Sequence, residues 1–480
     1  MVSGYIPTIG LEIHAELNTQ TKMFCDSKND SEEKNPNVNT CPVCLAHPGT
    51  LPVINREAVR HVLRVGLAVG GTLADYTEFD RKNYFYPDLP KGYQISQYEY
   101  PLVSGGSLND VKITRVHLEE DTASSEHRDA TGETLIDFNR AGVPLMELVT
   151  EPVIGSPMEA GKFARELQLL LRYLGASEAN MEKGEMRVEA NVSVSLGKKL
   201  GTKVEIKNLN SFRSVERAID FEIKRQVHLL ESGGAVVQET RGWDEGKQAT
   251  YPQRIKEGSA DYRYFPDPDL PSLKLQDVPE FSVSTLREHM PELPFEKRAR
   301  YLSLGLKAED VEFLVTDTRF GAFYDKVTRG MLDMPSRIAA ANYLTNDVVS
   351  IIRDMEERDS VSCSEIPLVP QNFREIISMV AKKEISSRSA KDLLLVSVSD
   401  SRSPTEIARE LGLYVKLSKD LSGIVHAVIE QNRVVVDDYK AGKTSALQFL
   451  VGQGMKMTRG ASDPEILKNM IQNSIEGKSI

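Results

Sequence analysis

The chain has 480 residues, of which 40% are hydrophobic and 27% charged, a composition typical of a globular protein with room for several domains. No apolar run reaches the roughly 18 residues of a membrane span, and four cysteines are too few for a disulfide framework. We therefore expect a cytoplasmic protein without a membrane partner. The net charge of −11 argues against nucleic-acid binding over the whole surface.

The first predicted element is a strand over residues 10–16, in which apolar and polar side chains alternate between two faces. Glu12, His14 and Glu16 share the polar face, and carboxylates with an imidazole suit Mg²⁺, Mn²⁺ or Zn²⁺. Taken alone, the pattern is more often a half-buried edge strand with a solvated face. Carboxylates further along the chain shift the balance towards a metal site.

A cysteine-rich stretch follows this strand. Cys25 is joined by Cys41 and Cys44 of a Cys-Pro-Val-Cys segment, which is similar to a zinc knuckle. A structural zinc site needs four ligands, and Asp26 or His47 would have to supply the fourth. Because only three thiolates are present, we expect zinc to be absent or weakly held.

Apolar residues at helical spacing predict a short helix over residues 56–70. Residues 79–93 then mix aromatic residues, prolines and cations without a period, which predicts a structured loop. Such a loop can line a cavity and offer Lys82 or Lys91 to a phosphate. A loop that is merely well packed is the plainer interpretation.

Two further stretches carry acidic residues in informative positions. Residues 111–121 alternate as a strand and end in three adjacent acids, whose mutual repulsion raises their pKa unless a cation lies among them. Glu147 interrupts the apolar run 143–149, where a buried carboxylate must find a partner or a metal. We interpret Glu147 as a functional residue in preference to a structural one.

Residues 156–174 predict a core helix with Ser156 as its N-cap. Two alternating strands lie on either side of residue 200: residues 187–193 place Arg187 and Glu189 on one face, and residues 203–207 align Lys207 with Glu205. A helix from 214 to 230 follows. Three strands with ionic faces and apolar backs predict one sheet whose open face is a site. A solvated sheet face is the alternative, but it seldom combines metal-type ligands with aligned lysines.

The chain changes character after the prolines at residues 291–294, beyond which only helical spacing is found. Residues 411–480 hold nine Lys or Arg and seven Asp or Glu, a net charge of +2 that leaves −13 for the rest. Three apolar stripes in this tail predict a small helical bundle. We therefore divide the chain into residues 1–293, 294–410 and 411–480.

Several long motifs in a fixed order carry a resemblance to a known family. They are Gly-Leu-Glu-Ile-His at 10–14, Phe-Asp-Arg-Lys-Asn-Tyr-Phe-Tyr-Pro-Asp at 79–88, His-Leu-Glu-Glu-Asp at 117–121, Lys-Asn-Leu-Asn-Ser at 207–211, Asp-Tyr-Arg-Tyr-Phe-Pro at 261–266 and Phe-Leu-Val-Gly-Gln at 449–453. Over its whole length the chain closely resembles the B subunit of the glutamyl/aspartyl-tRNA amidotransferase. The resemblance implies an α+β fold: a kinase-like cradle domain on a mixed or antiparallel sheet, then an all-helical domain and a helical tail that contacts tRNA.

The resemblance also implies a reaction and its partners. ATP phosphorylates the side-chain carboxylate of a misacylated Glu-tRNA or Asp-tRNA, and ammonia made from glutamine by the amidase A subunit then displaces the phosphate. A small C subunit completes the complex. A magnesium ion is implied at Glu12, His14, Glu120, Glu147 and Glu189, four of which are also the implied catalytic residues: Glu12, His14, Glu120 and Glu147. Ser27 departs from zinc-bearing members, which have cysteine there.

Cations at two places are candidates for contacts with the substrates. For phosphate or channel contacts they are Lys82, Lys91, Arg187 and Lys207, and for tRNA in the tail they are Lys440, Lys443, Lys456, Arg459 and Lys468. Two other classes of protein stay open. A metal-dependent hydrolase would use the Glu and His face without ATP. A non-catalytic tRNA-binding scaffold would use the tail and would have no need of Glu147 in an apolar run.

Overall fold

The computed structural model describes residues 4–128, 131–197, 199–255, 262–331, 333–359, 363–415, 418–458 and 462–477. The chain forms two compact units, Met1–Pro294 and Phe295–Ile480. The first unit is built on a sheet and the second is helical. This mixed organisation agrees with the predicted fold class, whereas the likeness to kinases stays a prediction.

A ten-stranded sheet organises the first unit, in the order β15-β14-β13-β12-β1-β11-β8-β6-β2, with β7 paired to β8. Its strands are β1 (Ile6–Glu16), β2 (Thr72–Leu73), β6 (Val103–Ser104), β7 (Ser107–Leu108), β8 (Val111–Glu120), β11 (Pro144–Thr150), β12 (Met186–Ser195), β13 (Val204–Leu209), β14 (Glu239–Asp244) and β15 (Ala249–Ile255). Neighbours are antiparallel except β13 and β14. The three strands predicted to have ionic faces are β1, β12 and β13, and they are adjacent, as expected.

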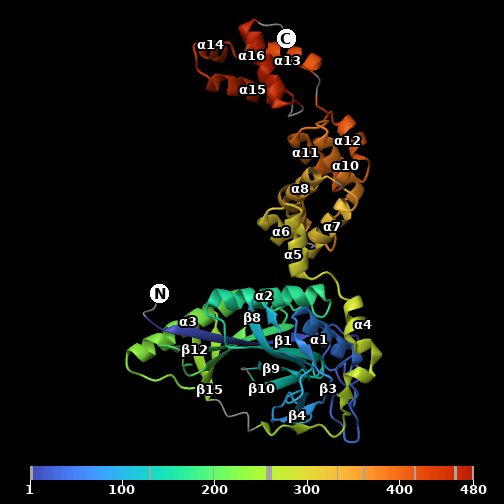
Figure 1. The fold of residues 1–480 in the computed structure, drawn as a ribbon, viewed down its shortest axis with the longest axis vertical. Coiled ribbons are helices and arrows are strands. Elements are labelled where there is room, and N and C mark those ends of the chain that lie inside the picture. Colours follow the sequence, from blue (N-terminus) through green and yellow to red (C-terminus); the bar gives the residue numbers. More distant parts are fainter. Residues whose placement is uncertain are drawn as a thin grey trace. The chain divides into compact units, whose positions relative to one another are not determined.

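Helices cover the apolar face of this sheet (Figure 1). They are α1 (Arg56–Ala68), α2 (Pro157–Tyr173) and α3 (Phe212–Glu231). The Ser156 hydroxyl accepts a hydrogen bond from the Glu159 amide at 3.2 Å, so α2 begins where its N-cap predicted. Ser211 caps α3 in the same way, so that helix begins two residues before the predicted start. The apolar residues of β1 and its neighbours form one buried core with these helices, which leaves the polar side chains on the other face.

Smaller strand pairs and turns complete the first unit. They are β3 (Tyr76–Thr77) with β17 (Leu273–Lys274), β4 (Asp80–Asn83) with β5 (Tyr93–Ser96) and β16 (Phe265–Pro266), β9 (Ser124–Arg128) with β10 (Glu133–Asp137), α4 (Val283–Glu288), and 3₁₀ turns at Leu275–Asp277 and Pro279–Phe281. The expectation of a loop over residues 79–93 is therefore wrong at both ends, where β4 and β5 form. β4 pairs with β5 over its whole length, and with β16, about 180 residues later, through Asp80 and Arg81. The second partner is invisible to local pattern.

The second unit consists of helices. They are α5 (Pro294–Ser303), α6 (Ala308–Thr316), α7 (Thr318–Thr328), α8 (Met334–Asn342), a π-helical segment (Tyr343–Val348), α9 (Val349–Asp359), α10 (Pro370–Ala381), α11 (Ser387–Ser397), α12 (Pro404–Glu410), α13 (Ser418–Gln431), α14 (Arg433–Lys440), α15 (Ser445–Met457) and α16 (Pro464–Glu476). Within the described ranges, no helix is both long and apolar enough to span a membrane.

The last four helices share a core. The predicted apolar stripes meet there, with Leu421, Val425, Leu450, Leu467 and Ile471 among the buried residues. This confirms that the stripes bury one another. The boundary at residue 410 and the separate function of the tail stay predictions.

Candidate active site

The polar face of the sheet gathers ionisable side chains from five adjacent strands. In the antiparallel register His14 lies opposite Glu147 on β11 and Arg187 on β12, while Glu12 lies opposite Glu189. Paired residues of antiparallel strands project to the same side of the sheet. We call the following set the acidic face: Glu12, His14, His117, Glu119, Glu147, Glu189 and Glu205.

The acidic face contains three overlapping groups whose ligand atoms lie within 4.8 Å of one another. One is Glu12, His14 and Glu147; the second is His117, Glu119 and Glu147; the third is Glu12, Glu189 and Glu205. Glu147 and Glu12 each belong to two groups. The structure therefore brings together four of the predicted ligands: Glu12, His14, Glu147 and Glu189.

Glu147 is held by two histidines. Its Oε2 lies 3.4 Å from His14 Nε2 and 3.3 Å from His117 Nε2. The Arg115 Nε–H donates to His117 Nδ1 at 3.4 Å, so His117 Nε2 is the nitrogen that donates to Glu147. His14 Nε2 also lies 3.4 Å from Glu119 Oε1. The carboxylate predicted to be exceptional in an apolar run thus sits at the centre of the polar contacts.

The charges of the acidic face shift one another's pKa. Burial raises the pKa of Glu12, and the carboxylates of Glu147 and Glu189 raise it further. Burial would lower the pKa of His14, but its hydrogen bond to Glu147 and the surrounding carboxylates raise it to about 9. Burial opposes ionisation of Glu147, yet His117 and His14 hold its pKa well below the usual range. Within the described ranges Glu12 has no ion pair within 4 Å, and the more distant charges of His14 and Lys207 offset the rise in its pKa only in part.

Three of the predicted cations border the acidic face. Lys207 Nζ lies 2.8 Å from Glu189 Oε2. Arg187 donates to Asp121 Oδ2 at 2.5 Å, at the edge of the face. Lys82 of β4 is enclosed, and although burial would lower its pKa, the carboxylates of Glu119 and Glu147 hold that pKa above its ordinary value.

Aromatic rings form the surroundings of Lys82. Its Nζ lies 5.2 Å from the ring centroid of Tyr262 and 5.9 Å from that of Tyr84. Tyr264 stacks on Tyr98, with centroids 4.2 Å apart. The two aromatic segments thus meet around one ammonium group, whose pKa the carboxylates of Glu119 and Glu147 raise.

The structure does not bring Glu120 to the acidic face. Glu120 lies opposite Pro144 and has the parity of Val116 and Leu118, so it projects to the side of the sheet that the helices cover. Its carboxylate accepts hydrogen bonds from Lys91 Nζ at 2.8 Å and from the Ile95 amide at 2.9 Å. The preceding residue, Glu119, occupies the position beside His14 that was expected of Glu120.

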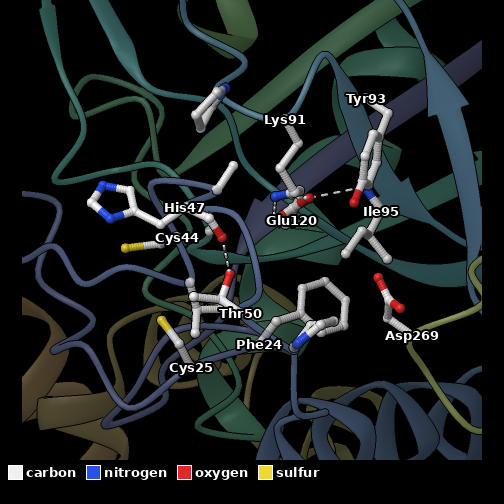
Figure 2. A pocket seen from close by; sticks show the side chains of 15 residues that line it. Phe24, Cys25, Cys44, His47, Thr50, Lys91, Tyr93, Ile95, Glu120 and Asp269 are labelled. Atoms are coloured by element: carbon white, nitrogen blue, oxygen red, sulfur yellow. Dashed lines mark hydrogen bonds and ion pairs between the residues drawn. The ribbon is translucent and has the colours of Figure 1, made fainter.

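Lys91 and Glu120 instead line a cavity of about 210 Å³ (Figure 2). Phe24, Cys25 and Cys44 also contribute to its wall. The four cations named from the sequence therefore fall into two places. Lys91 is at this cavity, and Lys82, Arg187 and Lys207 are at the acidic face.

The three cysteines of the knuckle-like stretch converge, with sulfur atoms within 4.8 Å of one another. The Ser27 Oγ lies 3.8 Å from Cys44 Sγ, where a fourth thiol would stand. The pKa of Cys44 is lowered to about 4, mainly by its hydrogen bond with the Cys25 thiol. Burial opposes this shift, whereas the Cys41 amide, Lys22 and Ser27 add to it. Lys22, fully buried, has its pKa lowered by that burial. The sulfurs fit a soft metal ion such as zinc, with one ligand missing.

In the tail, Lys443 pairs with Asp438 at 3.1 Å, while Lys440 and Lys456 lie in the last turns of α14 and α15. Lys468 lies on α16. Arg459 lies outside the described residues. Lys440, Lys456 and Lys468 therefore lie on helices of the bundle, and Lys443 lies between α14 and α15.

Comparison with known proteins identifies the family of this chain independently of its site geometry. Residues 7–279 match the family model "GatB/GatE catalytic domain", and residues 329–475 match "GatB domain". The chain is 44% identical over 477 residues to the B subunit of the aspartyl/glutamyl-tRNA(Asn/Gln) amidotransferase of Thermus thermophilus, covering 98% of this chain and 99% of that protein. Proteins of the same name from Crocosphaera subtropica and Thermoanaerobacter pseudethanolicus are each 40% identical, over 98% of this chain and 98% and 99% of their own lengths. The chain belongs to the amidotransferase B-subunit family.

Within this B-subunit chain, sequence reasoning did not select His117, Glu119 and Glu205 as site residues. Strand parity contained the signal for Glu119, because it follows His117 by two positions in the alternating stretch. Glu205 was aligned with Lys207 but was not assigned as a ligand. Tyr262 and Tyr264 stand in the Asp-Tyr-Arg-Tyr-Phe-Pro motif, but its spacing does not place them beside Lys82, because the β4–β16 pairing brings the two segments together.

Proposed function

We propose that this chain is the subunit that activates the aminoacyl group of a misacylated tRNA for amidation. ATP phosphorylates the side-chain carboxylate of Glu-tRNA(Gln) or Asp-tRNA(Asn), and ammonia then displaces phosphate to give Gln-tRNA(Gln) or Asn-tRNA(Asn). Glutamine supplies the ammonia in the amidase A subunit, and a small C subunit is part of the complex. The observation that carries the proposal is the group Glu12, His14 and Glu147, placed within 4.8 Å on one sheet face of a B-subunit family member.

The donor set of the acidic face suits a magnesium ion. Oxygen ligands dominate, and the like-charged Glu12, Glu147 and Glu189 lie close enough to raise the pKa of Glu12. We assign the ion to Glu12, His14 and Glu147, with Glu189 at its edge, and we replace Glu120 by Glu119. These side chains would hold the ion, which when bound would supply positive charge to the phosphoryl oxygens.

The protein's own side chains position the reactants. His117 holds Glu147 through Nε2, which keeps that carboxylate in one orientation. Lys82 and Lys207 are the cations that border the acidic face, and they provide contacts for phosphate oxygens. Phosphoryl transfer is mainly positioning and charge stabilisation, so this combination of carboxylates and ammonium groups suits it.

The acyl phosphate is sensitive to water, so the route of ammonia has to be enclosed. Lys91 lines the cavity with Glu120, on the side of the sheet opposite the acidic face. We assign Lys91 to a channel contact and Arg187, paired with Asp121, to the edge of the phosphate site. The bundle of residues 411–480 contacts the tRNA body through Lys440, Lys443, Lys456, Arg459 and Lys468.

One experiment separates this function from its alternatives. The complete complex is given Mg²⁺, ATP and glutamine, and ATP consumption is measured with misacylated tRNA, with correctly acylated tRNA and without tRNA. We expect ADP to form in step with amidated tRNA only in the first case. Hydrolysis that needs no ATP would instead indicate a metal-dependent hydrolase, and tRNA binding without ATP consumption a scaffold.

A further inference from the structure

A second cluster of reactive side chains lies apart from the acidic face. The sulfur atoms of Cys25, Cys41 and Cys44 lie within 4.8 Å of one another, and Cys44 is only 5% exposed. Cys25 comes from the segment after β1, and the other two from the tight turn of residues 41–44. All three carry free thiols.

Polar groups converge on Cys44. The Cys41 amide donates to its sulfur at 3.1 Å, and Lys22 Nζ lies 3.8 Å away. Lys22 is fully buried, and its other hydrogen bond goes to the Phe138 carbonyl at 3.1 Å. The Cys44 sulfur also lies 3.5 Å from the Cys41 carbonyl, to which the thiol donates when it is protonated. The amide and the Lys22 amine are the donors that favour negative charge on this sulfur, so we take Cys44 as the attacking sulfur of the three.

The cavity indicates how a small oxidant reaches the sulfur atoms and which cysteine pairs with Cys44. Cys25 and Cys44 both line the cavity of about 210 Å³, and Figure 2 shows both of their side chains at its wall. Cys41 does not line it. Ser27 Oγ lies 3.8 Å from Cys44 Sγ, and neither Asp26 nor His47 belongs to the group of ligand atoms within 4.8 Å, so the three sulfurs have no fourth zinc ligand among the described residues of that group.

We propose that Cys25 and Cys44 form a thiol pair that closes to a reversible disulfide when the protein meets hydrogen peroxide. The Cys44 thiol loses its proton and the resulting thiolate attacks one peroxide oxygen. The O–O bond breaks, the leaving oxygen takes up that proton and departs as water, and a sulfenic acid is left on Cys44. The Cys25 thiol then attacks the Cys44 sulfur, the S–O bond breaks, and the disulfide and a second water form. The two sulfurs lose two electrons and the peroxide gains them, so the step balances. A dithiol reductant restores both thiols.

The test is disulfide mapping on the full-length chain, purified under reductant without added metal and then exposed to a small molar excess of peroxide. Trypsin cleaves after Lys22, Lys28, Lys34 and Arg56, so Cys25 lies in peptide 23–28 and the other two cysteines in peptide 35–56. We expect these two peptides to be joined, with the loss of two hydrogen masses, and separated again by dithiothreitol. The thiol count in denaturant should fall from the four cysteines of the chain to two.

Variants define the pair. Cys44→Ser should abolish the joined peptides, whereas Cys363→Ser, in the second unit, should leave them unchanged. Cys41→Ser should also leave them, because Cys41 is not the resolving thiol. A disulfide confined to peptide 35–56, persistence of both thiols after peroxide, or stoichiometric zinc that protects all three cysteines would each overturn the proposal. The mapping uses the wild-type chain, so its result does not depend on the folding of a variant.

Discussion

His14 Nε2 on β1 lies 3.4 Å from Glu147 Oε2 on β11, in a register that places the two residues directly opposite each other. The contact links the first polar strand of the sequence to the carboxylate that interrupts an apolar run. Both residues belong to the group that we assign to magnesium. The strand register therefore places two proposed metal ligands in contact, and each of them can be replaced separately.

Replacing Glu147 by Gln should abolish tRNA-dependent amidation while the protein stays folded. The change keeps the size of the side chain but removes the charge that a metal ion requires. It weakens the contacts with His14 and His117, and this loss is offset by relief of the repulsion with Glu12. We expect activity to fall by at least about 100-fold, or roughly 3 kcal/mol of transition-state stabilisation. A melting curve recorded with the activity assay shows whether activity is lost from the site itself or through unfolding.

A matched control is Glu222→Gln. Glu222 is fully buried on α3, pairs with Arg225 at 2.7 Å and lies away from the acidic face. Breaking a buried ion pair costs about 3–5 kcal/mol, so this variant should lower the melting temperature while the protein that remains folded stays active. If Glu147→Gln instead behaves like Glu222→Gln, then Glu147 is a structural acid.

Adjacent glutamates on β8 should behave differently towards metal. Glu119 lies beside His14, and Glu120 projects to the other side of the sheet. Glu119→Gln should weaken Mn²⁺ binding by at least about tenfold, whereas Glu120→Gln should leave the affinity unchanged. Titration of Mn²⁺ followed by electron paramagnetic resonance measures both. A weaker affinity in Glu120→Gln alone would restore the ligand set inferred from family resemblance.

His61 should make the stability of the first unit depend on pH. Its Nε2 donates to the Asn18 carbonyl at 2.9 Å, and burial, with the charges of Arg64 and Arg60, lowers its pKa. The folded protein therefore binds this proton less readily than the unfolded chain. Stability from neutral His61 is complete above the unfolded pKa of about 6.5 and is lost as pH falls below it, by at most about 1.4 kcal/mol per pH unit.

The comparison for this effect is His61→Gln, whose amide can still donate to Asn18. Urea unfolding between pH 7.5 and 5.5 should show a difference between wild type and variant that shrinks as pH falls. A difference that stays constant across this range would mean that His61 titrates alike in the folded and unfolded chains.

Lysines of the tail should govern the salt dependence of tRNA binding. Each phosphate contact that is lost reduces the slope of log affinity against log salt by about 0.7 to 0.9. A variant with Lys440, Lys456 and Lys468 changed to Gln should therefore raise the KM for charged tRNA and flatten its salt dependence. Lys224→Gln, which removes a solvent-exposed lysine paired with Asp220 in the first unit, is the control. An unchanged slope in the triple variant would remove the tail from tRNA recognition.

Strand parity predicted much of the site. The alternation at residues 10–16, 187–193 and 203–207 correctly indicated strands of one sheet, because a period of two places every second side chain on the same face. The same rule places Glu119 and Glu120 on opposite sides of the sheet, whereas the resemblance to known relatives favours Glu120 as a ligand. Which of the two contacts the metal stays a prediction that the Mn²⁺ titration tests.

Long-range pairing was beyond the sequence patterns. The Arg81 ion pair with Asp267, at 2.9 Å, and the approach of Tyr262 to Lys82 both depend on β4 meeting β16. Such pairings are fixed by the packing of the whole unit and leave no mark in the spacing of neighbouring residues. The convergence of three cysteines could be anticipated, whereas the burial of Lys22 beside them could not.

The most direct measurement is amidation by the complete complex carrying His14→Ala. Amide formation on misacylated tRNA and glutamine hydrolysis are measured in parallel at limiting Mg²⁺. If His14 holds the metal at the acidic face, amide formation should be lost while glutamine hydrolysis in the amidase partner largely remains. Full amidation by His14→Ala under these conditions would contradict the assignment of the acidic face as the site of carboxylate activation.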